Sequence, residues 1–127
     1  MSNLTNYSEN WMLKVQLTTE VVTRPTAWWV GVGTGRNDDG ITGEPSGNGY
    51  ARQSATFSVT ADTSTNTALL VFGPCATASW GSISTVGIFD AATGGNCLWA
   101  GNLAAARTVD VGDSLTIAAS AFSQTMS

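Results

Sequence analysis

The pattern of apolar and polar positions divides the chain into a short helical start and a longer part with strand character. In the first segment, apolar residues recur at intervals of three and four, at Leu4, Tyr7, Trp11 and Val15. This spacing predicts a helix over about residues 3–17, with those side chains on one face. The candidates for its N-cap are Ser2, Asn3 and Thr5. β-Branched residues follow, and Pro25 favours extended backbone, so the helix is expected to end before residue 18.

From residue 27 onward the period changes to that of β-strands. Residues 27–33 (AWWVGVG) are rich in aromatic and β-branched side chains, which predicts a strand. Residues 50–59 alternate, and the expected buried face is Ala51, Gln53, Ala55, Phe57 and Val59. Further strands are predicted over residues 67–72, 80–90, 96–103, 108–111 and 115–119. The Gly- and Pro-rich residues 35–49 are expected to be a turn and loop, and residues 91–95 a hairpin loop.

Short strands separated by frequent turn signals are typical of antiparallel β architectures. The sequence therefore predicts a mainly β protein, an antiparallel β-sandwich or barrel of jelly-roll-like form, with one short N-terminal helix. A length of 127 residues fits a single domain, residues 1–127, whose β part spans about residues 27–126.

Charge is scarce in this chain. Charged residues make up 11% of the sequence, against roughly 25% in ordinary globular domains. The net charge is −4, and the basic residues are scattered, at Lys14, Arg24, Arg36, Arg52 and Arg107. A nucleic-acid partner needs clustered cations and is not expected. A surface that is polar through Ser, Thr, Asn and Gly instead favours burial of part of it against copies of the same chain, as a homo-oligomer, or against other partners.

Groups that carry catalysis are few. There is no histidine, so the commonest general base and metal ligand is missing. Asp38 and Asp39, with Glu44 nearby, have the composition of a turn more than of a calcium loop. Asp90 and Asp113 are also explained by turns, although a glycosidase pair is the alternative. We therefore predict no catalytic, cofactor or metal site, and a protein that is not an enzyme.

The two cysteines and the N-terminus bear on the compartment. Cys75 and Cys97 are expected to be free, buried and hydrophobic, with a disulfide possible if their strands are neighbours. The N-terminal residues do not resemble a secretory signal, and no apolar run approaches the roughly 20 residues that span a membrane. No membrane association is expected.

Five tryptophans are many for this length. Trp28 and Trp29 are adjacent in a predicted strand, so their side chains point to opposite faces of the sheet. If one of them packs in the core, the other faces solvent, the helix or another subunit. This pair is the strongest indication of an interface or of a sugar-stacking surface. The interface candidates are Trp28, Trp29, Tyr50 and Arg52.

Several stretches together resemble a known family. They are residues 11–13 (WML), 28–32 (WWVGV), 49–53 (GYARQ), 78–96 (ASWGSISTVGIFDAATGGN) and 109–117 (VDVGDSLTI). In these stretches the chain is similar to small virion proteins of tailed bacteriophages, labelled tail fibre, minor tail or head decoration protein. The resemblance covers nearly the whole chain and is most specific in residues 78–96. Cys75 and Cys97 depart from it, because ordinary small or aliphatic residues are expected there.

The resemblance implies a structural role in the virion, after synthesis in the host cytoplasm, and it implies no catalytic residues. Our main prediction is a capsid decoration (cement) protein that binds the assembled head as a homo-oligomer, such as a trimer, with the major capsid protein as partner. The alternative is a tail-fibre or minor tail accessory protein that contacts other tail proteins. A third hypothesis, from a different class, is a carbohydrate-binding module.

Overall fold

The computed structural model describes residues 3–125 of the chain, which form one helix and eleven strands. The helix is α1 (Asn6–Leu17). The strands are β1 (Trp28–Gly33), β2 (Gly35–Asn37), β3 (Gly40–Thr42), β4 (Gln53–Ala55), β5 (Phe57–Thr60), β6 (Thr63–Asn66), β7 (Leu70–Phe72), β8 (Gly81–Phe89), β9 (Cys97–Val109), β10 (Leu115–Ile117) and β11 (Ser123–Thr125). This confirms the mainly β class with one short N-terminal helix.

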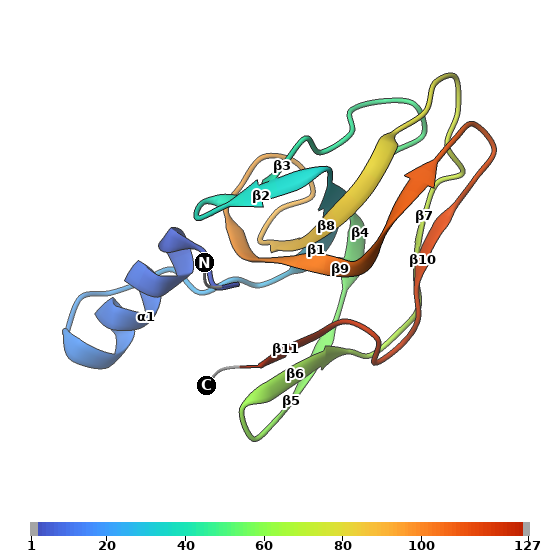
Figure 1. The fold of residues 1–127 in the computed structure, drawn as a ribbon. Helices are drawn as coiled ribbons and strands as arrows, with labels where there is room; N and C mark the ends of the chain where they lie inside the picture. The colour runs from blue at the N-terminus through green and yellow to red at the C-terminus, as the bar shows by residue number, and fades with distance from the viewer. Residues whose placement is uncertain (1–2, 126–127) are drawn as a thin grey trace.

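The largest sheet has the strand order β4-β1-β8-β9, and all of its pairs are antiparallel. The β8–β9 hairpin forms its longest ladder and crosses the middle of the molecule (Figure 1). Three smaller antiparallel groups, β7–β10, β5–β6–β11 and β2–β3, complete the described chain. Over residues 3–125 the sheets remain separate and do not close into a barrel.

The main core is built by alternate residues of β1 and β8 together with β7. Val30, Val32, Ile83 and Phe72 are completely buried there. The ring of Tyr50 packs edge-on against that of Trp80, with centroids 5.3 Å apart. Burial of such large apolar side chains contributes about 1.5–3 kcal/mol each, and it fixes β1, whose other residues build the site described below.

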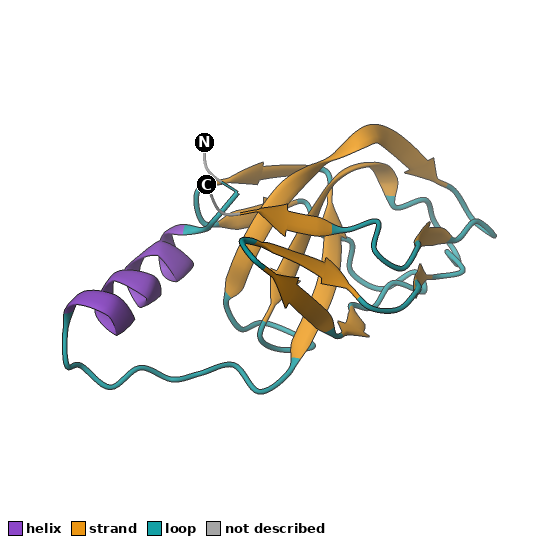
Figure 2. Ribbon diagram, turned by 90° about the horizontal axis from the view of Figure 1, so that it is seen from below, coloured by secondary structure: helices purple, strands orange, loops and turns teal. Residues whose placement is uncertain are grey.

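Helix α1 begins at Thr5, one of the predicted caps. The Thr5 hydroxyl accepts a hydrogen bond from the Ser8 N–H at 3.3 Å and donates to the carbonyl of Cys97 at 2.7 Å. The start of the helix is therefore attached to β9. The rest of the helix and the segment after it extend away from the sheets (Figures 1 and 2).

The apolar face of this helix is only partly covered. Tyr7 and Val15 are 37% and 46% exposed, and the buried helical residue is Ser8. The physical reason is that the helix contacts the sheet through its first turn, so the apolar side chains farther along have little to pack against. The indole N–H of Trp11 donates to the carbonyl of Thr23 at 2.8 Å, which joins the helix to the returning segment.

Several predicted strand boundaries are wrong. The expected loop at residues 35–49 contains the β2–β3 hairpin. The expected strand at residues 50–59 begins only at β4 and breaks before β5, and Val59 is 74% exposed rather than buried. The strands predicted over residues 96–103 and 108–111 are one strand, β9. The polar strands β6 and β11 were not predicted, because their residues have the composition of loops and their pairing is non-local.

Cys75 and Cys97 are free and buried, as predicted. They belong to two different apolar clusters: Cys75 lies in the main core, and Cys97 lies with Phe89 and Ala100. Within residues 3–125, no helix has the length and apolar character needed to cross a bilayer.

Candidate functional site

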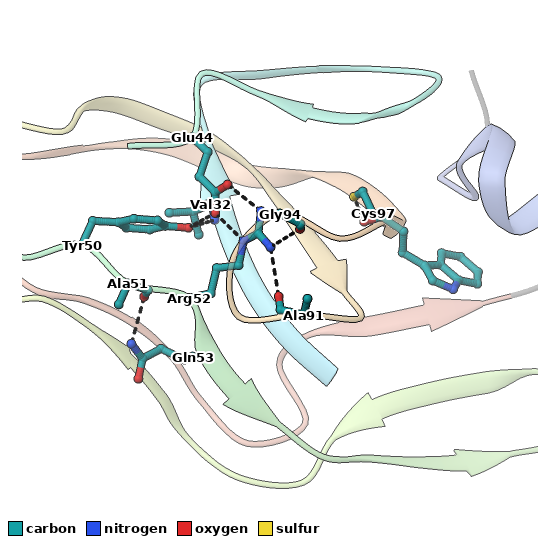
Figure 3. A network of polar contacts seen from close by, with 10 residues as sticks. Val32, Glu44, Tyr50, Ala51, Arg52, Gln53, Ala91, Gly94 and Cys97 are labelled. Carbon is teal, nitrogen blue, oxygen red and sulfur yellow. Dashed lines mark hydrogen bonds and ion pairs between the residues drawn. The ribbon is translucent and has the colours of Figure 1, made fainter. Parts of the chain in front are cut away.

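Three residues from the segment between β3 and β4 converge at one end of the central sheet (Figure 3). Arg52 binds Glu44 through two hydrogen bonds, from Nε to Oε2 at 2.8 Å and from Nη2 to Oε1 at 2.9 Å. The hydroxyl of Tyr50 donates to the same Oε2 at 2.6 Å. Paired N–H donors facing both carboxylate oxygens form the strongest type of side-chain ion pair. We call Glu44, Tyr50 and Arg52 the Glu44 network.

Arg52 also reaches the hairpin loop between β8 and β9. Its Nη1 donates to the carbonyls of Ala91 at 3.0 Å and Gly94 at 2.8 Å. Its guanidinium carbon lies 3.5 Å from the centre of the Phe89 ring, as a cation–π contact. One arginine therefore joins the loop before β4 to the loop after β8 (Figure 3). It also contacts an aromatic side chain of β8.

The Glu44 network packs directly against the backbone of strand β1. The backbone N–H of Val32 donates to the Tyr50 hydroxyl at 3.1 Å. A Cβ atom at Gly31 would lie 2.7 Å from Glu44 Oε2 and 3.0 Å from the Tyr50 hydroxyl. Because such contacts are too close, a residue without a side chain at position 31 allows the carboxylate to approach the strand.

The electrostatics of the network follow from this packing. Burial acts to raise the pKa of Glu44, but hydrogen bonds from Arg52 and Tyr50 and the charge of Arg52 outweigh it, so the pKa lies below its ordinary value. Burial, followed by the hydrogen bond to Glu44, raises the pKa of Tyr50 well above its ordinary value. The pKa of the nearby Cys97 thiol is raised, chiefly by burial. At neutral pH the network therefore contains one carboxylate, one guanidinium and a neutral phenol.

A depression with a volume of about 530 Å³ opens beside the network. Its lining residues are Trp29, Glu44, Pro45, Ser46, Gly47, Tyr50, Ala51, Arg52, Ala92, Thr93 and Gly94. We call it the Trp29 depression. Trp29 is half-buried and packs against the cluster formed by Phe89, Cys97 and Ala100.

Trp28 lies in a different place, as its neighbouring position in a strand requires. It is 36% exposed and lines an apolar groove of about 420 Å³ between α1 and the sheet. The other lining residues are Leu4, Tyr7, Ser8, Trp11, Met12, Arg24, Pro25, Leu98 and Trp99. We call it the Trp28 groove.

The four interface candidates are thus divided by the structure. Trp29, Tyr50 and Arg52 come together around the Trp29 depression, and Trp28 does not. Sequence reasoning missed the role of Glu44, which was grouped with Asp38 and Asp39 as turn residues. The available signal was an isolated Glu44 and an isolated Arg52 inside a segment with little other charge.

The other four acidic residues considered in the sequence analysis, Asp38, Asp39, Asp90 and Asp113, have structural roles. Asp38 and Asp39 form the two-residue turn of the β2–β3 hairpin, in which Asn37 pairs with Gly40, so the predicted turn is confirmed. Asp90 accepts a hydrogen bond from the backbone N–H of Asn96 at 2.8 Å, across the loop after β8.

Asp113 accepts a hydrogen bond from the backbone N–H of Asp110 at 3.2 Å, in the turn after β9. Asp90 and Asp113 lie beyond opposite ends of the β8–β9 ladder, so they are too far apart to act as a catalytic pair. Within residues 3–125, no group of three or more acidic or cysteine side chains is placed to hold a metal ion.

Comparison with known families identifies the class of protein, a structural component of a bacteriophage virion. The family model that matches residues 3–125 is described as podophage GP4 fiber I protein gp80, and the chain belongs to this family. Comparison with curated proteins gave no match. The family confirms the resemblance to phage virion proteins and places the protein in the virion.

Proposed function

We propose that this protein is a tail-fibre component of a podophage and that it acts as a single domain through shape and contact. The observation that carries the proposal is the match to a phage fibre family over residues 3–125. It supports the tail-fibre alternative better than the capsid decoration role that was our main prediction.

A role without catalysis is supported by how the charged side chains are used. In the Glu44 network, both carboxylate oxygens are bound by Arg52, and one of them also by Tyr50. A general base must be able to accept a proton from a substrate. A carboxylate with a lowered pKa and such donors is better suited to holding loops together than to proton transfer.

For assembly, we propose that a second copy of the chain covers the Trp28 groove. Among the lining residues within 3–125, Arg24 is the one that is charged, so an apolar partner that covers the groove desolvates little charge. The second half of α1 and the segment after it, which we call the arm (residues 13–21), offer exposed aliphatic side chains at Leu13, Val15, Leu17 and Val21. Aromatic residues in a groove are common anchors of protein interfaces. The arm of one copy and the groove of another are therefore complementary in polarity.

Imaging of intact particles tests the location. We expect cryo-electron microscopy of the encoding phage to place the fold, with its projecting helix, in the tail fibres, and antibodies against the protein to label the tail. Density at the icosahedral sites of the head, with an unlabelled tail, would instead establish the decoration role.

Sedimentation equilibrium of the purified protein tests the assembly surface. We expect self-association that Trp28→Ser weakens at least tenfold. Val111→Ser is the matched control, because Val111 is exposed in the turn after β9 and does not line the groove. Equal association of both variants and the unchanged protein would exclude the groove as the contact.

A further inference from the structure

We propose that the Trp29 depression binds a neutral saccharide, with the Trp29 ring as the stacking surface and the Glu44 carboxylate as a fixed acceptor for sugar hydroxyls. As the description of a receptor contact, this inference rests on the proposed function. As a statement about binding, it rests on the geometry of the depression alone.

Size and position suit a small ligand. The volume of about 530 Å³ falls within the 300–1,000 Å³ that is typical of small-molecule sites. Two loops form its walls, residues 44–52 and residues 91–95, and Arg52 joins them through Ala91 and Gly94. Loops on a rigid sheet are the usual carriers of binding sites, and here the ion pair with Glu44 keeps both loops in place.

Trp29 provides an aromatic surface that cannot easily move. Its backbone lies between two strands, paired with Ser54 on β4 and with Phe89 on β8. Its ring is half-buried against the Phe89 cluster and also lines the depression. A large ring held in this way offers contact area at little cost in conformational entropy. The apolar C–H face of a pyranose ring matches such a surface.

Glu44 supplies the polar part of the recognition. Two ionised oxygens have about four acceptor positions, and Arg52 and Tyr50 occupy three of them with the bonds described above. The Glu44 side chain is still 24% exposed, whereas that of Arg52 is 9% exposed. The remaining acceptor capacity therefore lies on the carboxylate, which can receive a hydroxyl without rearranging.

The charge balance selects a neutral ligand. Glu44 and Arg52 neutralise each other, and the other lining residues are uncharged. An anionic ligand finds no unpaired cation here, and a cationic ligand finds no unpaired carboxylate. Ser46 and Thr93 add hydroxyl groups to the lining, which can both donate and accept. An uncharged polyhydroxyl ligand with one apolar face satisfies all of these groups.

The test is a titration of the purified full chain, labelled with 15N at its tryptophan indoles, with methyl glycosides of glucose, galactose, mannose and N-acetylglucosamine. We expect at least one glycoside to shift the Trp29 indole signal in a saturable way, with a dissociation constant of about 1–10 mM for a single ring. The Trp28 signal should not move, because Trp28 lines the other groove.

Variants locate the binding. Thr93→Ala should weaken it about threefold to tenfold, the loss expected for one hydrogen bond. Trp29→Ala should abolish it, and because this variant lacks the indole, its binding is followed through the backbone amide signals of residues 91–95 in uniformly 15N-labelled protein. Thr108→Ala, at an exposed position of β9 outside the depression, is the matched control and should bind like the unchanged protein. Since Trp29→Ala removes packing against Phe89, its fold is checked by the backbone amide spectrum, and the exposed Thr93 serves as the variant that keeps the core intact.

Three results would overturn the proposal. The first is no response of the Trp29 indole to any of the glycosides at tens of millimolar, and the second is unchanged binding by both Thr93→Ala and a folded Trp29→Ala. The third is tighter binding of galacturonate than of methyl galactoside. The location of the protein in the particle does not enter this assay. A protein found in the tail fibres that binds no sugar would therefore refute the saccharide site alone.

Discussion

Glu44 and Arg52 are eight positions apart in a loop-rich segment, yet their side chains form a two-bond ion pair with N–O distances of 2.8 and 2.9 Å. The Arg52 side chain is only 9% exposed, and its Nη1 group donates two further hydrogen bonds to loop carbonyls. The pair thus fixes the geometry of one end of the central sheet, and its disruption should be measurable as a loss of stability.

Replacing Arg52 with alanine should lower the free energy of unfolding by about 2–4 kcal/mol, since a partly buried carboxylate then loses its partner. Arg52→Lys should recover only part of this loss, because a single ammonium group cannot bind both oxygens. Chemical denaturation measures both changes. Arg107→Ala, at an exposed position of β9, is the control and should change stability by less than about 0.5 kcal/mol. A loss for Arg52→Ala no larger than the control's would show that the pair contributes little.

Gly31→Ala should be strongly destabilising, by about 2–3 kcal/mol. The added methyl group would lie 2.7 Å from Glu44 Oε2 and 3.0 Å from the Phe89 ring, and neither neighbour is free to move away. Gly101→Ala is the matched control in β9, where the nearest heavy atom is 3.7 Å away. Thermal unfolding compares the two variants. Similar melting temperatures for them would contradict the close packing at Gly31.

Acidification should selectively weaken the protein through Glu44. Because its pKa is lowered in the folded state, Glu44 contributes stability that is complete above its ordinary pKa of 4.5 and is lost as the pH falls through the folded-state value. Denaturation curves measured from neutral pH to below 4.5 should therefore show a steeper decline for the unchanged protein than for Glu44→Gln. Parallel declines would mean that other carboxylates cause the acid sensitivity.

The Thr5 hydroxyl should strengthen the attachment of α1, which is also held by backbone hydrogen bonds from Thr5 to Leu98 and from Asn6 to Asp38. Thr5→Val keeps the shape of the side chain but removes the cap to Ser8 and the bond to the Cys97 carbonyl, which should cost about 1–2 kcal/mol. Thr5→Ser retains the hydroxyl and should stay within about 0.5 kcal/mol of the unchanged protein. Hydrogen exchange of the α1 amides provides the local measurement, with faster exchange expected in Thr5→Val only.

Much of the fold is determined locally and was predicted. The 3.6-residue period and a capping hydroxyl at Thr5 specify a helix, and the aromatic and β-branched residues of β1 and β8 specify strands in any folded context. Free, buried cysteines followed from their scarcity and from the ordinary behaviour of thiols. The adjacency of Trp28 and Trp29 fixed their opposite orientation, because a strand alternates its side chains.

Only the tertiary structure decided which of these features meet. Strands such as β6 (TSTN) carry no hydrophobic signal, and their pairing with β5 and β11 becomes favourable only in the assembled sheets. Likewise, Glu44 and Arg52 lie in a segment with the composition of a loop, and their pairing depends on the space left by Gly31 and on the carbonyls of the loop after β8. The periodicity of a sequence indicates which face of a single helix or strand is buried. This site instead arises from contacts between different elements, and no local sequence pattern encodes the distances between them.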